Sequence, residues 1–101
     1  MQYELTEGTA GRARVTLSGR LTFSDAPKFA KVLDLIVSRG KKGCDIDLIG
    51  LDFIDSTGMS LFVYVYDAVK AEELDIAVRN VKGVVREALC RAGFDTLFAL
   101  G

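Results

Sequence analysis

The segment Leu51 to Met59, LDFIDSTGM, holds the side chains best placed to do chemistry. Asp55, Ser56 and Thr57 are all residues that cap the N-terminus of a helix, and Gly58 follows them. A hydroxyl in the first turn of a helix lies at the surface beside backbone N–H groups, where added negative charge is tolerated. Taken alone, these four residues indicate only the start of a helix.

The side chains needed for catalysis or for metal binding are scarce in this chain. The chain contains no histidine, which excludes Ser-His and Cys-His nucleophilic pairs and histidine-ligated metal sites within it. Cys44 and Cys90 are the only cysteines, and their spacing fits no metal site, so we expect reduced core thiols. The aspartates between positions 45 and 55 come without a phosphate-cradling glycine-rich loop or a nucleophile-base pair. We therefore expect no enzymatic activity, no metal and no cofactor.

Length and charge limit the architecture and the partners. The 101 residues suffice for one domain, and a formal charge of -1 provides no general attraction for nucleic acid. The longest apolar run, Leu61 to Tyr66, is too short to cross a bilayer, and Met1 to Glu7 does not resemble a secretory signal. We expect a cytoplasmic protein that neither binds nucleic acid nor inserts into a membrane.

The chain opens with two alternating segments, Gln2 to Thr6 and Arg12 to Leu17, separated by glycines. This pattern predicts an antiparallel hairpin with one solvated face, on which Arg12 and Arg14 lie in water. A helix capped by Ser24 or Asp25 follows and ends at Arg39 and Gly40. Its apolar spacing places six residues inward: Ala26, Phe29, Ala30, Leu33, Ile36 and Val37.

The middle of the chain predicts a strand and then a helix. Cys44, Ile46 and Leu48 alternate with aspartates, which is typical of a strand. Ser60 to Lys70 is rich in strand-favouring residues, yet its apolar stripe and its capping sequence favour a helix. We expect the inward stripe to be Met59, Phe62, Val63, Tyr66 and Val69, and a second, partly exposed apolar face to be Leu61, Tyr64 and Val65.

The remaining residues predict a strand from Leu74 to Arg79, a helix that stops at Gly93 and a short end segment over 96–100. The inward residues of that helix are expected to be Val81, Val84, Val85, Ala88, Leu89 and Ala92. The predicted order is β-β-α-β-α-β-α with a short end, which is an α/β fold. We expect one mixed sheet with helices packed mainly on one face.

The stretch Ile46 to Met59, IDLIGLDFIDSTGM, resembles the phosphorylation motif of the STAS domain, named for sulphate transporters and anti-sigma factor antagonists. Ser18 to Leu21 resembles the family's exit from its second strand, and Val84 to Phe98 resembles its closing helix and tail. The resemblance covers nearly the whole chain, so residues 1–101 are identified as one STAS domain. This setting favours a modified serine over a simple helix cap.

The resemblance implies a phosphorylation switch. In the family, a cognate anti-sigma factor kinase phosphorylates the serine that follows the aspartate of the motif, and a serine phosphatase reverses the reaction; here that serine is Ser56. The unphosphorylated protein binds the kinase-type anti-sigma factor and releases a sigma factor. Gly58 is expected to leave the approach to the serine uncrowded. The expected partner-binding residues are Asp55, Ser56, Thr57, Gly58, Met59 and Leu61.

Other readings stay open. The same domain could serve as an interaction module in a lipid-transport ATPase complex, a chemotaxis-linked signalling system or a stress-sensing assembly. An enzyme lacks the residues described above. A phospho-aspartate receiver domain would need an acidic cluster after its first strand, whereas Thr6-Glu7-Gly8 offers one acid.

Overall fold

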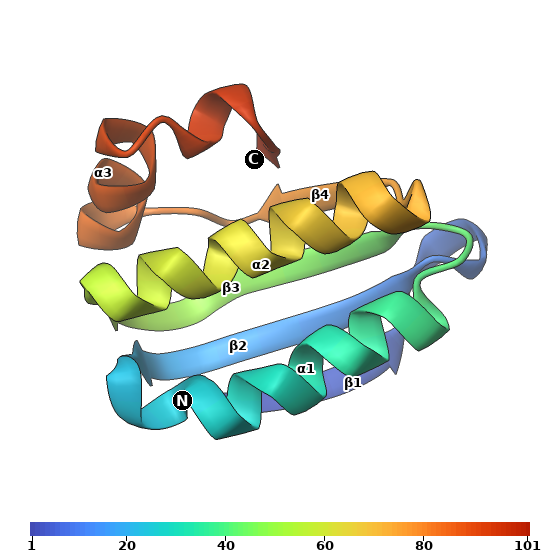
Figure 1. The fold of residues 1–101 in the computed structure, drawn as a ribbon, viewed down its shortest axis with the longest axis horizontal. Coiled ribbons are helices and arrows are strands. Elements are labelled where there is room, and N and C mark those ends of the chain that lie inside the picture. The colour runs from blue at the N-terminus through green and yellow to red at the C-terminus, as the bar shows by residue number, and fades with distance from the viewer.

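A computed structural model describes all residues, 1–101, and contains one five-stranded sheet with the strand order β1-β2-β3-β4-β5 (Figure 1). Strand β2 runs antiparallel to β1, and the other neighbouring strands pair in parallel. The strands are β1 (Gln2–Glu7), β2 (Ala13–Leu21), β3 (Cys44–Ile54), β4 (Ile76–Arg79) and β5 (Ala99–Leu100). The helices are α1 (Ala26–Arg39), α2 (Ser56–Glu72) and α3 (Gly83–Arg91). Three short 3-10 turns also occur: η1 (Thr9–Gly11), η2 (Phe23–Asp25) and η3 (Phe94–Thr96). The predicted order of elements and the mixed sheet are confirmed.

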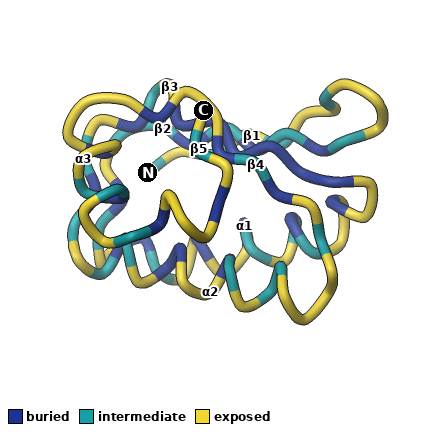
Figure 2. The backbone as a smooth tube through the Cα atoms, turned by 90° about the horizontal axis from the view of Figure 1, so that it is seen from above, coloured by how far each residue is buried: buried dark blue, intermediate teal, exposed yellow.

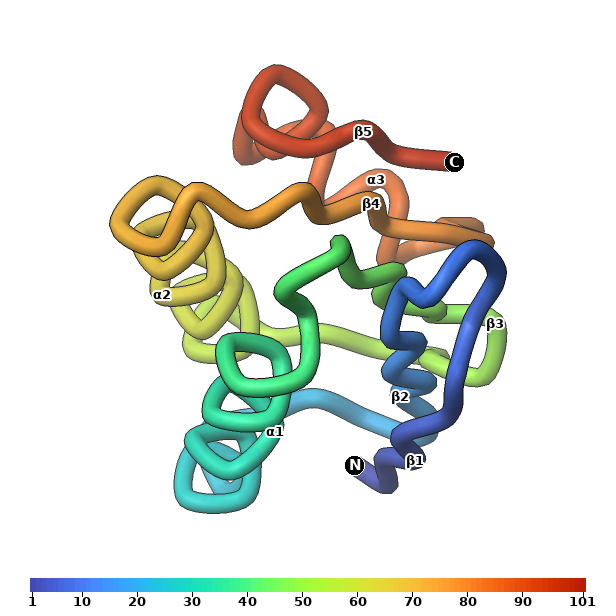
Figure 3. Tube along the Cα trace, turned by 90° about the vertical axis from the view of Figure 1, so that its right-hand side faces the viewer, coloured from blue at the N-terminus to red at the C-terminus, as the bar shows by residue number.

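Helices α1 and α2 connect parallel strands and cover the same face of the sheet (Figures 1 and 3). A parallel pair needs a long crossover connection: α1 lies between β2 and β3, α2 lies between β3 and β4, and α3 lies in the third crossover, between β4 and β5. Strand β4 pairs only with the first half of β3, and α3 lies alongside the second half. Because the helices cover one face of the sheet, buried residues line the strands and the inner sides of the helices, while the outward turns of the helices are exposed (Figure 2).

The inward face of α2 differs from the predicted stripe. Phe62 is buried as expected, but Val63 is 44% exposed, and Leu61 and Val65, expected on the exposed side, lie in the core. Tyr64 is exposed, as expected. The rotation of the helix is set where it starts, because Gly58 packs against the end of β2, and a sequence pattern of nearly continuous apolar residues does not contain that contact.

The inward faces of the other two helices were also predicted only in part. Val32 is buried where Ala30 was expected, and Val84 and Ala92 on or just after α3 are exposed. Phe62 lies at the centre of an aromatic cluster, with its ring centroid 6.1 Å from Phe29 and 6.4 Å from Phe98. This cluster packs the C-terminal segment against α2.

The outer face of the sheet carries ion pairs, which corrects the expectation that Arg12 and Arg14 are solvated. Arg12 Nη2 lies 2.9 Å from Asp45 Oδ1, and Arg14 pairs with Asp47. Both aspartates are buried in spite of lying on this face. Burial alone would raise the pKa of Asp47, but hydrogen bonds from Asn80, Arg14 and the Ile49 N–H outweigh burial and hold that pKa below its usual value.

Both cysteines are free, and Cys44 is buried as predicted. Burial, assisted by the nearby charge of Asp45, raises the pKa of the Cys44 thiol to about 11. A thiol with such a pKa stays protonated at neutral pH and is a poor nucleophile. Cys90 is only partly buried.

Candidate functional site

Ser56 is the first residue of α2 and follows the C-terminal end of β3, the middle strand of the sheet. The end of β2 lies beside it, since Leu21 is the register partner of Ile54. Ser56 is exposed, and the hydrogen bonds of this loop leave its hydroxyl unengaged. The side chain is therefore accessible to an external protein.

Asp55 is the N-cap of α2 and also joins two segments of the chain. One carboxylate oxygen, Oδ1, accepts a hydrogen bond of 2.7 Å from the Gly58 N–H. The other, Oδ2, accepts one of 3.2 Å from the N–H of Phe23 in turn η2. The backbone N–H of Asp55 itself donates to Leu21 O at 3.2 Å. The loop that bears the serine is thus bonded to the turn that follows β2.

Gly58 is buried, and the reason for a glycine here differs from the one expected. A Cβ at this position would lie 2.6 Å from Leu21 O and 2.8 Å from Ile54 Cγ1. Glycine therefore lets the first turn of α2 approach the end of β2, and its missing side chain faces the protein interior instead of a partner's approach to Ser56.

The expected partner-binding residues fall into two groups in the structure. Ser56 is exposed, and Asp55, Thr57 and Met59 are partly buried around it. Gly58 and Leu61 are buried, and Leu61 is only 7% exposed. These two residues pack below the surface and offer little contact area to another protein.

Sequence reasoning missed Phe23. Phe23 is 73% exposed, and its backbone N–H donates a hydrogen bond to the carboxylate of Asp55, which precedes Ser56. The only signal in the sequence is an apolar residue between Thr22 and Ser24, at a point where a turn between a strand and a helix is expected. The bond to Asp55 spans 32 positions of the chain and has no counterpart in any local pattern.

The chemistry that this arrangement supports is acceptance of a group on the Ser56 hydroxyl. The hydroxyl makes no hydrogen bond to a basic side chain of the chain itself. A phosphate on Ser56 meets the positive end of a helix but also the neighbouring carboxylate of Asp55, which already occupies the Gly58 N–H.

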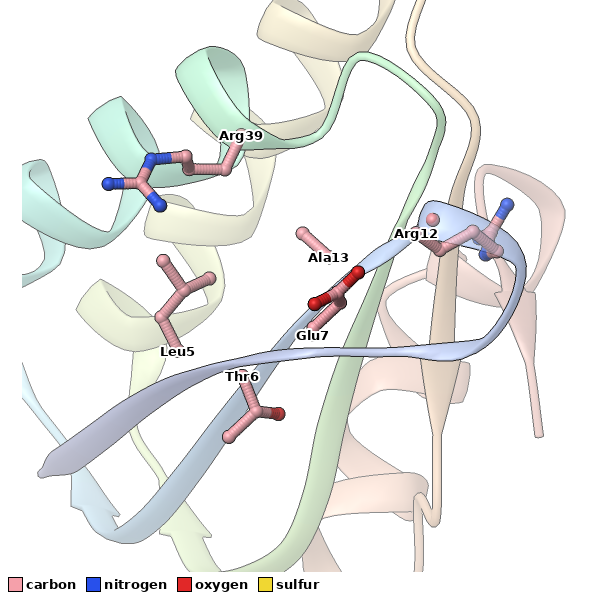
Figure 4. A pocket seen from close by; sticks show the side chains of 7 residues that line it. Leu5, Thr6, Glu7, Arg12, Ala13 and Arg39 are labelled. Atoms are coloured by element: carbon pink, nitrogen blue, oxygen red, sulfur yellow. The ribbon is translucent and has the colours of Figure 1, made fainter.

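A shallow cavity of about 310 Å³ lies at the other end of the sheet, next to the β1–β2 connection (Figure 4). It is lined by Leu5, Thr6, Glu7, Gly11, Arg12, Ala13 and Arg39. Figure 4 shows that the guanidinium groups of Arg12 and Arg39 point away from each other, so they form no joint anion site. Since Ala13 pairs with Cys44 at the start of β3, the cavity is remote from Ser56 at the end of that strand.

The chain contains no group of three or more His, Cys, Asp or Glu side chains arranged to hold a metal ion. None of its helices combines the length and the apolar character that crossing a membrane requires.

The fold and the site together define a small α/β domain with a mixed sheet and an exposed serine at the start of the helix that follows the middle strand. The chain belongs to the STAS domain family: the family model described as "Mlab, STAS domain" matches residues 5–100. No curated protein matches the sequence closely.

Solved structures share this fold. An anti-sigma factor antagonist from Mycobacterium paratuberculosis superposes with a TM-score of 0.83 at 22% identity, covering 98% of this chain and 83% of that one. The unphosphorylated anti-sigma factor antagonist SpoIIAA gives 0.78 at 19% identity, with 99% and 88% covered. A sulfate transporter family protein from Wolinella succinogenes gives 0.73 at 22% identity, with 90% and 80% covered. The fold is thus common to anti-sigma factor antagonists and to a transporter family protein.

Proposed function

We propose that this protein is an anti-sigma factor antagonist whose partner binding is switched by phosphorylation of Ser56. The observation that carries the proposal is the exposed Ser56 hydroxyl at the start of α2, directly after the capping Asp55, in a STAS domain. The unphosphorylated form binds a kinase-type anti-sigma factor, which then releases a sigma factor. Solved relatives by fold include SpoIIAA in its unphosphorylated and its phosphorylated form.

The covalent step is a phosphoryl transfer. The kinase moves the γ-phosphoryl group of ATP to Ser56 Oγ, a base of the kinase takes the hydroxyl proton, and ADP leaves. A serine phosphatase reverses the modification by hydrolysis, in which water takes up the phosphoryl group and the serine hydroxyl is restored.

Phosphorylation acts at the partner surface and leaves the fold in place. The phosphate adds about 1.5 to 2 negative charges at pH 7. Because Ser56 is exposed, the protein alone can hydrate this charge. In a complex the phosphate is covered, and it lies next to the carboxylate of Asp55, so desolvation and repulsion oppose binding.

The alternative is that the domain serves as an interaction module of another bacterial assembly, such as a lipid-transport ATPase complex. Its support is the family model, described as "Mlab, STAS domain", and the shared fold of the Wolinella succinogenes sulfate transporter family protein. This reading keeps the same exposed surface around Ser56 and changes the partner.

Affinity capture with the full chain as bait separates the two. We expect a small ATP-dependent kinase to be retained from a lysate of the source cells by the wild-type chain. With ATP, the purified kinase should add one phosphate, and peptide mass mapping should place it on Ser56, while Ser56→Ala stays unmodified. Retention of a transporter ATPase would support the alternative, and a phosphate on Thr57 would contradict the assignment of Ser56.

A further inference from the structure

The turn η2 and the start of α2 lie on the same side of the molecule (Figure 1), are joined by the hydrogen bond from Phe23 N–H to Asp55, and each carry one exposed group. One is the Ser56 hydroxyl, and the other is the Phe23 ring, which has the largest exposed fraction of any large hydrophobic side chain in the protein. A single exposed ring is common on protein surfaces. The connection of this ring to the serine loop is what distinguishes it.

The backbone that carries Phe23 is held in place from both sides. On one side, Thr22 and Asp25, which flank Phe23 and Ser24 along the chain, form a capping box, in which the Thr22 N–H donates to Asp25 Oδ2 at 2.9 Å. Asp25 is buried; burial would raise its pKa, but hydrogen bonds from Thr22 and the N-terminal ammonium outweigh that effect and lower the pKa. On the other side, Asp55 Oδ2 accepts the Phe23 N–H. The turn is therefore ordered before any partner binds.

The usual size of a protein interface implies that a protein bound at Ser56 also covers Phe23. A standard protein interface buries about 800 Å² on each partner, which corresponds to a disc with a radius of about 16 Å. Phe23 is one hydrogen bond away from Asp55, the residue that precedes Ser56, so it lies well inside a disc centred on the serine. Buried aromatic rings on pre-ordered backbone are typical anchors of such interfaces.

We propose that Phe23 is the anchor residue for the kinase that modifies Ser56, and that Asp55 is a positioning residue that holds the ring beside the serine. The proposal rests on the function proposed above and deepens it. The occupant of this surface is the kinase itself, with an apolar recess beside its active site to receive the ring. Asp55 acts through its bridge between the Gly58 N–H and the Phe23 N–H.

The test is steady-state phosphorylation of the full chain by the captured kinase, with initial rates measured against chain concentration. Phe23→Ala should raise KM at least tenfold and leave kcat within about twofold, because it removes binding that is present before and during the reaction. Phe23→Leu, which keeps an apolar side chain, should recover part of the loss. Circular dichroism should show both variants folded, since the ring is largely outside the core.

Ile49→Ala is the matched control. Ile49 is 52% exposed, but it precedes Asp55 by six residues along β3, which is a distance of about 20 Å. Its KM should be that of the wild type. A similar rise for Ile49→Ala would overturn the anchor role of Phe23, because any loss of apolar surface would then have the same effect.

Asp55→Asn tests the bridge. The single amide oxygen can still cap α2, but the amide nitrogen cannot accept the second N–H, so one of the two bonds is lost. KM should rise, and the double variant with Phe23→Ala should be no worse than Phe23→Ala alone. Additive effects would show that Asp55 acts independently of Phe23 and would refute the positioning role.

The outcomes also separate this proposal from the proposed function. If the wild type is phosphorylated on Ser56 and Phe23→Ala has an unchanged KM, or loses only kcat, the anchor is refuted and the proposed function stands. If no captured kinase phosphorylates the wild type, the proposed function fails and the anchor fails with it.

Discussion

At the scale of single residues, Ser56 and Asp55 have separate tasks. Asp55 provides the helix cap and the bond to η2, and Ser56 provides an exposed hydroxyl that takes no part in the hydrogen bonds of the loop. Because the serine hydroxyl makes no hydrogen bond within the loop, we expect a group added to it to change the surface more than it changes folding.

Ser56→Asp should weaken binding of the anti-sigma partner at least tenfold, which is about 1.4 kcal/mol. Its free energy of unfolding should stay within about 1 kcal/mol of wild type, since a carboxylate at the start of a helix is favourable. Ser56→Ala should bind as tightly as wild type. Calorimetric titration and thermal melting of both variants measure these quantities. An aspartate variant that loses binding only because it has unfolded would refute the interface mechanism.

At the scale of elements, the site depends on how closely the start of α2 approaches the end of β2. The contact is made by Gly58, whose Cα faces Leu21 O and Ile54. The same approach allows the Asp55 N–H to reach Leu21 O at 3.2 Å.

Gly58→Ala should lower the free energy of unfolding by about 1 to 3 kcal/mol, because the added methyl group would lie too close to the Leu21 carbonyl, which also accepts the Asp55 N–H. The sign of this change is the test, because Gly→Ala at an uncrowded position inside a helix stabilises a protein by up to about 1 kcal/mol. Glu72→Ala, an exposed position at the other end of the same helix, is the control and should change stability by less than about 0.5 kcal/mol. Urea unfolding measures both. A stabilised Gly58→Ala protein would contradict the close contact.

At the scale of the whole molecule, the two faces of the sheet are held by different forces. The inner face packs against α1 and α2 through apolar and aromatic side chains. The outer face is held by carboxylates, of which Asp47 connects β2 through Arg14 with the residue after β4 through Asn80 Nδ2 at 2.8 Å. The ion pair with Arg14 requires an ionised carboxylate.

The free energy of unfolding of the wild type should fall as the pH is lowered from 7 to 3. The Asp47→Asn variant should show a smaller fall. The pKa of Asp47 is lower in the folded protein than its value of about 3.9 in the unfolded chain. Its contribution is therefore fully present above the unfolded pKa and is lost as the pH falls from about 4 through the folded pKa. At pH 7 the variant should be less stable by about 1.5 to 3 kcal/mol, the range for hydrogen bonds to charged groups.

Urea unfolding at pH 7 and pH 3 measures this difference. The control is Asp34→Asn, which changes an exposed carboxylate on α1 and should change the free energy of unfolding at pH 7 by less than about 0.5 kcal/mol. If Asp47→Asn and the wild type lost the same free energy between the two pH values, the ion pair would have no part in acid stability.

The sequence by itself determined the order of the elements, the α/β class and the place of Ser56. Period-2 alternation marks β1, β2, β3 and β4 because one side of a strand faces the core, and this holds whatever the strand pairs with. The segment Asp55 to Gly58 marks a helix start because capping involves residues two or three positions apart. Such signals are local, and they survive in a single chain without any tertiary information.

The tertiary structure decided which side chains meet. The rotation of α2, which buries Leu61 and exposes Val63, follows from the contact of Gly58 with Leu21, far away in sequence. The pairing of Arg14 with Asp47 follows from the register of β2 and β3. The neighbourhood of Phe23 and Ser56 follows from a hydrogen bond across 32 positions. Each of these needs two segments brought together by packing, and the free energy that selects one rotation or register is shared over the whole core, so no local pattern encodes it.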